Sequence, residues 1–387
     1  MSPKRIRATT ALFFVVASAT AGVTLAGGAS GAPSASISAS ASASTAPAPT
    51  TIPAWAPGSG RAQPIVVIAG ENGGTELTDF MIPFAVLKRA GIRTVAVAAH
   101  EGPLRFRPAL RAELDATMAE FDAQHPEGAD YVVVPAMVNR ADPTVLAWLA
   151  EQARKGATVV SICDGALVVG SAGLLEGKWA TAHWASEGLR LKQFPGTRWV
   201  RNSRYVVDGR IISSAGISAA MPTSLALVEA ISGKARAAEV AREMEISDWS
   251  PHHDSDAFRP RFGNLGTYAV KLMVNPYLRR TQTIGVPLAA RMDEINLAIL
   301  ADAYSRTGRS RAVSTATTGV PVASRYGLRF LPDVVGESRS VDIVLPPVAN
   351  TAAGRAFDTT LASIAARYGR RTAYSVALDF EYPGYTQ

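Results

Sequence analysis

The chain has 387 residues and a formal net charge of +7, from 39 lysines and arginines against 32 aspartates and glutamates. The basic residues are scattered, and no aromatic-interleaved groove or helix-turn-helix pattern accompanies them, which argues against nucleic acid as a partner. The chain holds one cysteine, so an intramolecular disulfide is excluded and stability has to come from packing.

The first 32 residues have the layout of an export signal. Three basic residues precede an uncharged stretch of apolar and small residues at positions 8–29. We expect either a signal peptide, with a possible cleavage site at 30–32, or an uncleaved N-terminal membrane anchor, because the stretch is long enough for both. Either alternative predicts a chain that is secreted or held on the outer face of the cytoplasmic membrane.

Residues 33–60 are rich in Ala, Ser, Pro and Thr and lack the apolar periodicity that a packed core requires. We therefore expect a disordered linker here. The chain that follows, residues 61–387, is long enough for one large or two small domains.

Residues 61–245 alternate between strand-like and helix-like segments. Short apolar, β-branched runs predict buried strands, and stretches with helical spacing predict the helices between them. The predicted strands are 64–69, 94–98, 130–134 and 157–162, and the predicted helices are 78–90, 142–155 and 165–175. This alternation implies a parallel sheet covered by helices on both faces.

Chemistry in such sheets collects at the carboxyl ends of the strands. Three candidates fall there: the loop at Gly73 and Gly74 followed by Asp79, the loop at 135–139, and Cys163. The domain then continues with a helix at 184–194, a hairpin at 204–213 turning at Asp208-Gly209, and helices at 214–231 and 235–244.

Cys163 lies between the predicted strand 157–162 and the small-residue helix 165–175. The unpaired N–H groups and the positive dipole end of that helix lower a thiol's pKa, which makes a thiolate nucleophile plausible. The alternative is an inert, buried small hydrophobe. Asp164 suits the helix dipole but opposes a negative charge on the neighbouring sulfur.

Three stretches carry a family resemblance: SICDGALVVGSAGLLEGKWATAHW, with TDFMIPFAVLKRAGIRTVAVA upstream and YVVDGRIISSAG downstream. Together they resemble the ThiJ/PfpI superfamily of class I glutamine-amidotransferase-like domains. The branch they resemble most contains isonitrile hydratases and the sensor domains of AraC-type regulators. The resemblance covers about residues 63–244 and implies a flavodoxin-like sandwich with a reactive cysteine at a strand-to-helix elbow.

The resemblance also implies roles for individual residues. Cys163 matches the elbow nucleophile, Asp79 matches an acidic residue that hydrogen-bonds the thiol, and His183 matches a nearby histidine that can relay a proton. The backbone of Gly74 is a candidate for an oxyanion site. The alternatives are a helix N-cap for Asp79 and a core or surface histidine for His183.

Two departures from the family pattern concern the pocket. Asp164 stands where hydratase-like members tend to have a hydroxyl residue, so it is a candidate substrate-site residue that puts hydratase activity in question. The loop Pro135-Ala-Met-Val replaces a more usual Pro-Gly-Gly. No cofactor is expected from the motifs.

Residues 246–278 form a predicted connecting segment. His252 and His253 lie here among aspartates, at 248–256. Adjacent histidines on an irregular segment rarely converge on a metal without a scaffold, so an ordered loop between domains is the favoured interpretation and no metal site is expected.

From residue 279 the pattern starts again. A strand at 283–289, a helix at 293–308 and a strand at 311–317 repeat the order of residues 65–98, and segments 340–346, 352–368 and 371–377 are aligned with the strand, helix and elbow strand that follow. In this alignment Asn296 replaces Asp79 and Ala377 replaces Cys163. We expect a degenerate, truncated copy of the fold with a structural role, forming an intramolecular pseudo-dimer; a homodimer or an unrelated α/β appendage are the alternatives.

Two classes of function remain. The first is an exported, cysteine-dependent hydrolase, hydratase or lyase for a small electrophile, in which Cys163 attacks, Asp79 tunes the thiol and His183 moves protons. The second is a ligand-binding or redox-sensing module that uses the same thiol without turnover and without DNA. A small molecule is the expected partner in both.

Overall fold

The computed structural model describes residues 48–57, 61–337, 339–348 and 351–386. The predicted export signal and most of the predicted linker lie outside these ranges. Within them, none of the helices combines the length and the apolar character that spanning a bilayer requires.

Residues 48–57 correct the predicted boundary of the linker. The N–H of Val207 donates to the carbonyl of Pro49, and the N–H of Trp55 donates to the carbonyl of Ala230, both at 2.8 Å. Ile52 and Trp55 also pack against the hydrophobic core. This stretch is therefore attached to the domain, because its apolar side chains, although too few to form a core, find one to pack on.

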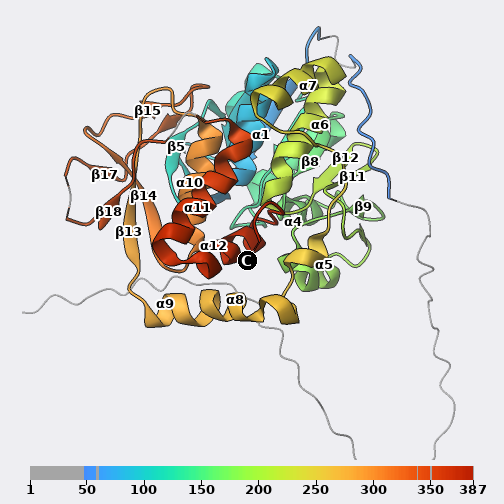
Figure 1. The fold of residues 1–387 in the computed structure, drawn as a ribbon. Coiled ribbons are helices and arrows are strands. Elements are labelled where there is room, and N and C mark those ends of the chain that lie inside the picture. The colour runs from blue at the N-terminus through green and yellow to red at the C-terminus, as the bar shows by residue number, and fades with distance from the viewer. Residues whose placement is uncertain (1–47, 58–60, 338, 349–350, 387) are drawn as a thin grey trace, which may run out of the picture. The chain divides into compact units, whose positions relative to one another are not determined.

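A seven-stranded sheet forms the centre of the first domain (Figure 1). Its order is β11-β12-β8-β7-β1-β3-β6, and every neighbouring pair is parallel except the β11-β12 hairpin. The strands are β1 Ile65–Gly70, β3 Arg93–Ala98, β6 Ala116–Thr117, β7 Tyr131–Val134, β8 Thr158–Ser161, β11 Tyr205–Asp208 and β12 Ile211–Ser214. The predicted α/β fold with a parallel sheet is confirmed.

Helices cover both faces of this sheet. The helices on one face are α1 Leu77–Arg89, α6 Ala220–Ser232 and α7 Lys234–Glu243; those on the other are α2 Met118–Gln124, α3 Pro143–Arg154 and α4 Gly165–Ser171. Alternate residues of β1 enter the two cores: Val66 and Ile68 join one, and Ile65 and Val67 the other. This is why the strand reads as a continuous apolar run.

The hairpin turn is shifted by one residue from its predicted position. Asp208 pairs with Ile211 in the ladder, so the two-residue turn is Gly209-Arg210. Gly209 has φ +64°, a conformation that glycine adopts without strain. The carboxylate of Asp208 accepts the N–H of Trp179 at 2.9 Å, which gives that residue a role in the strand rather than in the turn.

Two small sheets complete the first domain. One pairs β9 Trp179–Ala180 with β10 Arg198–Trp199, beside helix α5 Glu187–Gln193. The other has the order β15-β16-β5-β4-β2, from β2 Thr75–Glu76, β4 Leu104–Arg107, β5 Arg111–Glu113, β15 Val322–Ala323 and β16 Arg329–Phe330. In this second sheet Phe330 pairs with Ala112, so the later part of the chain extends a sheet of the first domain.

The chain beyond residue 280 repeats part of the first domain. Its parallel sheet has the order β17-β14-β13-β18, from β13 Gln282–Pro287, β14 Ser310–Ala316, β17 Val334–Val335 and β18 Ile343–Val344. This order matches β6-β3-β1-β7. Helix α10 Glu294–Arg306 follows β13 as α1 follows β1, and both helices have 13 residues.

The predicted strand at 371–377 is wrong. Helix α11 Ala356–Tyr368 is followed across Gly369 (φ +90°) by helix α12 Arg370–Asp379. The pair α6-α7 is joined in the same way across Gly233 (φ +85°). Ala377 is therefore not the counterpart of Cys163: the repeat passes from β18 to a helix pair like α6-α7 and has no elbow strand.

The reason for this error lies in the spacing of the apolar residues. Ala373, Val376, Ala377 and Phe380 are all buried, and they recur at the three- and four-residue intervals of a helix. A short apolar run after a glycine is ambiguous between strand and helix unless the residues beyond it are counted.

Candidate functional site

Cys163 sits at a strained turn between β8 and α4. It has φ +55°, which is uncommon for a residue with a side chain, and its exposed fraction is 5%. Gly165 permits the turn: a Cβ there would lie 1.9 Å from the carbonyl oxygen of Val134 on β7. The elbow is thus pressed against the end of the neighbouring strand.

The three loops predicted at the carboxyl ends of the strands do come together. The N–H of Ala136 donates to Oδ2 of Asp79 at 3.2 Å, and the carbonyl of Ala136 accepts the N–H of Glu76 at 2.8 Å. The N–H of Val138 donates to the carbonyl of Gly74 at 2.8 Å. These bonds fasten the loop after β7 to the start of α1, beside the elbow.

Asp79 is a buried acid rather than a helix cap. The N-cap of α1 is Glu76, whose carboxylate accepts the N–H of Asp79 at 2.7 Å. Burial raises the pKa of Asp79 to about 8, although the N–H of Ala136 and the charge of Arg306 lower it. The carboxyl group is therefore protonated at neutral pH, and its Oδ1 has no hydrogen-bond partner among the described residues.

The thiol of Cys163 is not activated in the way its position suggested. Burial raises its pKa well above the ordinary value, and the carboxylates of Asp79, Asp164 and Glu76 raise it further. A hydrogen bond from the N–H of Asp164 acts in the opposite direction and is outweighed. The surroundings of the thiol thus oppose the predicted thiolate, because α4 is short and the surrounding acids disfavour a negative sulfur.

Asp164 adds a second unsatisfied oxygen to the site. It occupies the N-cap position of α4, but its side chain makes no capping bond, and its Oδ1 is buried without a partner in the described part of the chain. A buried acceptor without a partner is costly, and such groups are usually satisfied by water or a ligand.

His183 is held away from the role of proton relay. Its Nδ1 accepts the N–H of Ala185 at 3.1 Å, so the ring proton lies on Nε2, which donates to the carbonyl of Asp379 at 2.9 Å. Burial lowers the pKa of His183, which keeps the ring neutral. Both nitrogens are committed to the backbone, and the geometry supports the alternative of a core histidine.

Gly74 does not offer a free oxyanion donor. Its N–H donates to the carbonyl of Glu71 at 3.2 Å, and the N–H of Gly73 donates to the carboxylate of the same residue at 2.6 Å. A Cβ on Gly74 would lie 2.7 Å from Val138, so the glycine is needed for close packing of the loops.

The sequence did not reveal that the second half of the chain contributes charge to this site. Arg306, at the end of α10, donates to Oε1 of Glu76 at 2.6 Å and to Oδ1 of Asp302 at 2.5 Å. Burial lowers the pKa of Arg306, but the neighbouring Asp302 and Glu76 together raise it by more. The charge of Arg306 also acts on Cys163. The one sequence signal for this is the equivalence of Arg306 with Arg89, the last residue of α1.

The C-terminal segment closes one side of the site. Glu381 is fully buried at φ +51°, and its carboxylate accepts the N–H of Trp184 at 3.0 Å and contacts Nε2 of His253 at 2.7 Å. The N–H of Ser218 donates to the carbonyl of Phe380 at 2.8 Å. A Cβ on Gly216 would lie 2.6 Å from the Glu381 side chain, so this segment lies directly on the loop after β12.

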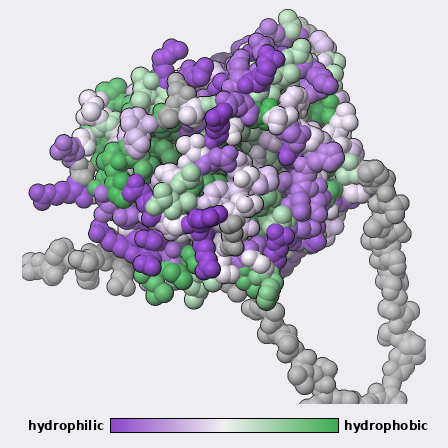
Figure 2. All heavy atoms as spheres, viewed as in Figure 1, coloured by the Kyte–Doolittle hydropathy of each residue, from purple (hydrophilic) through white to green (hydrophobic). Residues whose placement is uncertain are grey.

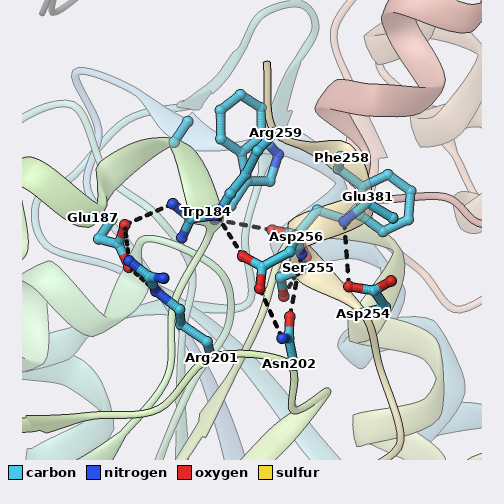
Figure 3. Close-up of polar contacts among 12 residues, drawn as sticks. Trp184, Glu187, Arg201, Asn202, Asp254, Ser255, Asp256, Phe258, Arg259 and Glu381 are labelled. Carbon is cyan, nitrogen blue, oxygen red and sulfur yellow. Dashed lines mark hydrogen bonds and ion pairs between the residues drawn. The ribbon is translucent and has the colours of Figure 1, made fainter. Parts of the chain in front are cut away.

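The histidine- and aspartate-rich loop that precedes α8 is ordered by ion pairs (Figure 3). The carboxylate of Glu187 lies between Arg201 and Arg259, which both donate to it at 2.6 Å, and Asn202 donates to Asp256 at 2.8 Å. Among the described residues, no group of three or more histidine, cysteine, aspartate or glutamate side chains is arranged to hold a metal ion.

The site is enclosed rather than open. Two surface cavities of about 650 and 670 Å³ lie beside residues 50–56, and neither is lined by Cys163 or Asp79. What the arrangement offers is a buried thiol, a buried protonated acid and two carboxyl oxygens without a hydrogen-bond partner among the described residues.

Comparisons with known proteins show a family similarity for the segment that contains Cys163, Asp79 and His183. The sequence model of the DJ-1/PfpI family matches residues 64–230. An isonitrile hydratase from Pseudomonas putida is 35% identical over 112 residues, which are 28% of this chain and 47% of that protein. The HTH-type transcriptional regulator CdhR from Pseudomonas aeruginosa is 30% identical over 112 residues, 29% of this chain and 33% of the regulator.

Among solved structures, DJ-1beta from Drosophila melanogaster aligns with a TM-score of 0.44 and 23% identity, over 48% of this chain and all of that one. The match to the two curated relatives above spans less than half of their own lengths. The predicted branch, with isonitrile hydratases and AraC-type regulators, is thus the one to which the chain is similar.

Proposed function

Since residues 64–230 form a DJ-1/PfpI family domain, we propose that the chain is a cysteine-dependent enzyme that adds water to a small, uncharged electrophile, or hydrolyses it, at Cys163. The observation that carries the proposal is that Asp79 lies close enough to the strained elbow thiol for its charge to act on the thiol's pKa. This acid is protonated below about pH 8, and its Oδ1 has no hydrogen-bond partner among the described residues. A proton donor and a nucleophile in one enclosed site suit general acid and covalent catalysis.

The protonation states set the order of events. Asp79 gives its proton to the substrate as the sulfur of Cys163 adds to the electrophilic carbon, and the thiol proton passes to the Asp79 carboxylate. Water then attacks the covalent adduct and gives one proton to the substrate nitrogen; the carbon–sulfur bond breaks, and the water's other proton returns to the sulfur. No thiolate has to exist in the resting enzyme, which fits a thiol whose pKa is raised.

Isonitriles are the first substrate class to consider, because a relative is named for this reaction. An isonitrile that takes up one water becomes an N-substituted formamide, and the steps above give this balance. Its terminal carbon accepts the proton and then bonds to sulfur. The negative charge of Asp164 disfavours an anionic substrate, and an uncharged one avoids that repulsion.

A second function is favoured by one observation. The thiol has an exposed fraction of only 5% and a raised pKa, as expected for a module that binds a ligand without turning it over. The unsatisfied oxygens of Asp79 and Asp164 would then accept N–H groups of that ligand.

The deciding experiment measures turnover of a panel of isonitriles, small amides and aldehydes by the chain and by Cys163→Ser and Asp79→Asn. Asn296→Ala is the matched control, because Asn296 holds the same position in α10 that Asp79 holds in α1. Turnover that is lost in the first two variants and kept in the third supports the enzyme. Turnover that survives in Cys163→Ser sinks it, and ligand binding without turnover in all four proteins selects the binding module.

The proposal also places the enzyme outside the cytoplasm, on the strength of the basic and apolar layout of residues 1–32. If the enzyme is anchored on the outer face of the membrane, protease added to intact cells is expected to degrade it. If it is secreted, it is expected in the culture medium. Full protection in intact cells, with degradation after lysis, contradicts export.

A further inference from the structure

One helix of the described chain has its apolar side facing outward. α8 Leu265–Ala269, a π-helical turn at Val270–Val274 and α9 Asn275–Leu278 form one continuous helix. Six large apolar residues on or just before it have exposed fractions between 39% and 97%. This outer face consists of Phe262, Leu265, Leu272, Met273, Tyr277 and Leu278.

The inner side of the same helix is polar. Thr267 is buried, Asn275 donates to the carbonyl of Thr307 at 2.8 Å, and Lys271 forms an ion pair with Asp379. A surface helix of a globular protein ordinarily buries its apolar stripe and exposes its polar one. Here the polar contacts fix the orientation of the helix, so the outer face cannot turn inward. Figure 2 shows hydrophobic residues at the lower edge of the molecule, where Figure 1 places α8 and α9.

The charges that this segment of the chain itself carries have one sign, although Lys271 and Arg280 are paired with acids from elsewhere in the chain. Residues 257–292 contain six arginines and lysines and no aspartate or glutamate. Arg261 precedes the outer face, and Arg279 and Arg280 follow it; all three are exposed, with Arg280 paired to Asp342. An apolar stripe with cations at both ends is the pattern of helices that lie in the interface of an anionic membrane.

We propose that the outer face docks on an anionic lipid surface, with its apolar side chains among the lipid headgroups and acyl chains and Arg261 and Arg279 on the phosphates. A single helix on a convex surface offers no groove for a peptide. A second copy is disfavoured as the occupant, because antiparallel pairing of two such helices sets Arg261 of one copy against Arg279 and Arg280 of the other.

The N-terminal sequence supports the same occupant. Residues 1–32 predict a segment that is inserted in or passed across a membrane, so export would bring the chain to a membrane surface. One weak interfacial helix gives reversible binding, and a second attachment makes it stable. The proposal rests on the orientation of the helix and on its charge; it does not depend on turnover at Cys163.

The test measures protection at the outer face itself rather than vesicle binding by the whole chain, because an N-terminal anchor would bind vesicles on its own. Amide hydrogen exchange of the full chain is measured without vesicles, with vesicles of phosphatidylcholine, and with vesicles that also contain phosphatidylglycerol. We expect exchange at residues 261–280 to slow only with the anionic vesicles. High salt should reverse the protection.

Two variants sharpen the test. Phe262→Asp with Tyr277→Asp removes apolar contact and adds negative charge at both ends of the outer face, and Val320→Asp is the control, because Val320 is an exposed apolar residue that is not part of that face. The double variant should lose the protection and bind anionic vesicles about tenfold more weakly or worse, while the control keeps both. Unchanged exchange with anionic vesicles overturns the proposal. So does a wild-type dimer that the double variant splits in light scattering, since the occupant is then a second copy.

Discussion

Arg306, the last residue of α10, donates a hydrogen bond of 2.6 Å to the carboxylate of Glu76, the N-cap of α1. The reverse contact is also present: Arg89, the last residue of α1, donates to Asp293, the N-cap of α10, at 2.9 Å. The two helices pack together with reciprocal ends, as the same patch does in a two-fold dimer. The contact between the two helices therefore has the reciprocal form of a two-fold interface within one chain.

The two ion pairs are equivalent in position but not in surroundings. Arg306 acts on the pKa of Asp79 and is in the field of Cys163, whereas Arg89 faces Asp293 at the far end of the helix pair. Arg306 thus lies at a site that contains a thiol, whereas Arg89 lies at the equivalent position in a place without one.

This asymmetry predicts different effects for matched variants. Arg306→Met should destabilise the protein by about 3 kcal/mol, because it leaves the buried carboxyl groups of Glu76 and Asp302 without this cation. Arg89→Met should destabilise it less, because Arg325 still lies 4.0 Å from the carboxylate of Asp293. Only Arg306→Met should also raise the pKa of Cys163, since only Arg306 favours the negative sulfur. Urea unfolding and the pH dependence of alkylation measure the two effects, and an equal pKa shift in both variants contradicts the assignment.

The parts of this fold that the sequence predicts are those encoded locally. The apolar run at 64–69 and the glycine after Cys163 are enough to predict a buried strand and an elbow, because each feature depends on neighbours in the sequence. Arg306 and Glu381 reach the site from helices and loops more than 140 residues beyond Cys163, and nothing local marks them. Asn296 could be aligned with Asp79 because both follow an N-cap by three residues.

The electrostatic surroundings of the thiol could not be predicted from the sequence for a related reason. The position of Cys163 at a helix N-terminus indicates a lowered pKa, whereas the buried carboxyl groups of Glu76 and Asp79 come from another helix and their burial is a property of the whole fold. A local rule of this kind fails when distant charges outweigh the local one.

Alkylation of Cys163 should therefore be slow at neutral pH, with an apparent pKa above the ordinary value of about 8.5. Asp164→Asn and Asp79→Asn should each lower that pKa, because each removes a negative charge that opposes the thiolate. Rates of iodoacetamide labelling between pH 6 and 10 measure it directly on the one thiol of the chain. A wild-type pKa at or below the ordinary value refutes the account.

Asp79→Asn should also stabilise the folded protein at neutral pH. In the unfolded chain Asp79 has a pKa of about 3.9, and in the folded chain about 8, so between these values the unfolded state has lost a proton that the folded state keeps. The wild type then becomes less stable as pH rises from about 4 towards 8, at a cost of about 2–4 kcal/mol at pH 7.

Asparagine removes that cost and still offers an oxygen to the N–H of Ala136. Urea unfolding at pH 7 should show the variant to be more stable, and at pH 4 the two proteins should be nearly equal. If Asp79 is a buried catalytic acid, Asp79→Asn should make the protein more stable and at the same time reduce turnover. A variant that is less stable at pH 7 would show instead that the carboxyl group is needed to hold the loop.

His183 predicts the opposite trend with pH. Burial lowers its pKa below the unfolded value of about 6.5, so as pH falls through that value the unfolded chain gains a proton that the folded chain refuses. Stability that depends on the neutral ring is complete above about pH 6.5 and declines below it. His183→Gln should flatten this decline by removing the group that titrates, and His252→Gln, on an exposed histidine, should leave it unchanged. The measurement is the free energy of unfolding at pH 7.5 and at pH 5. If this free energy falls equally in the wild type and in His183→Gln, the group that titrates is not His183.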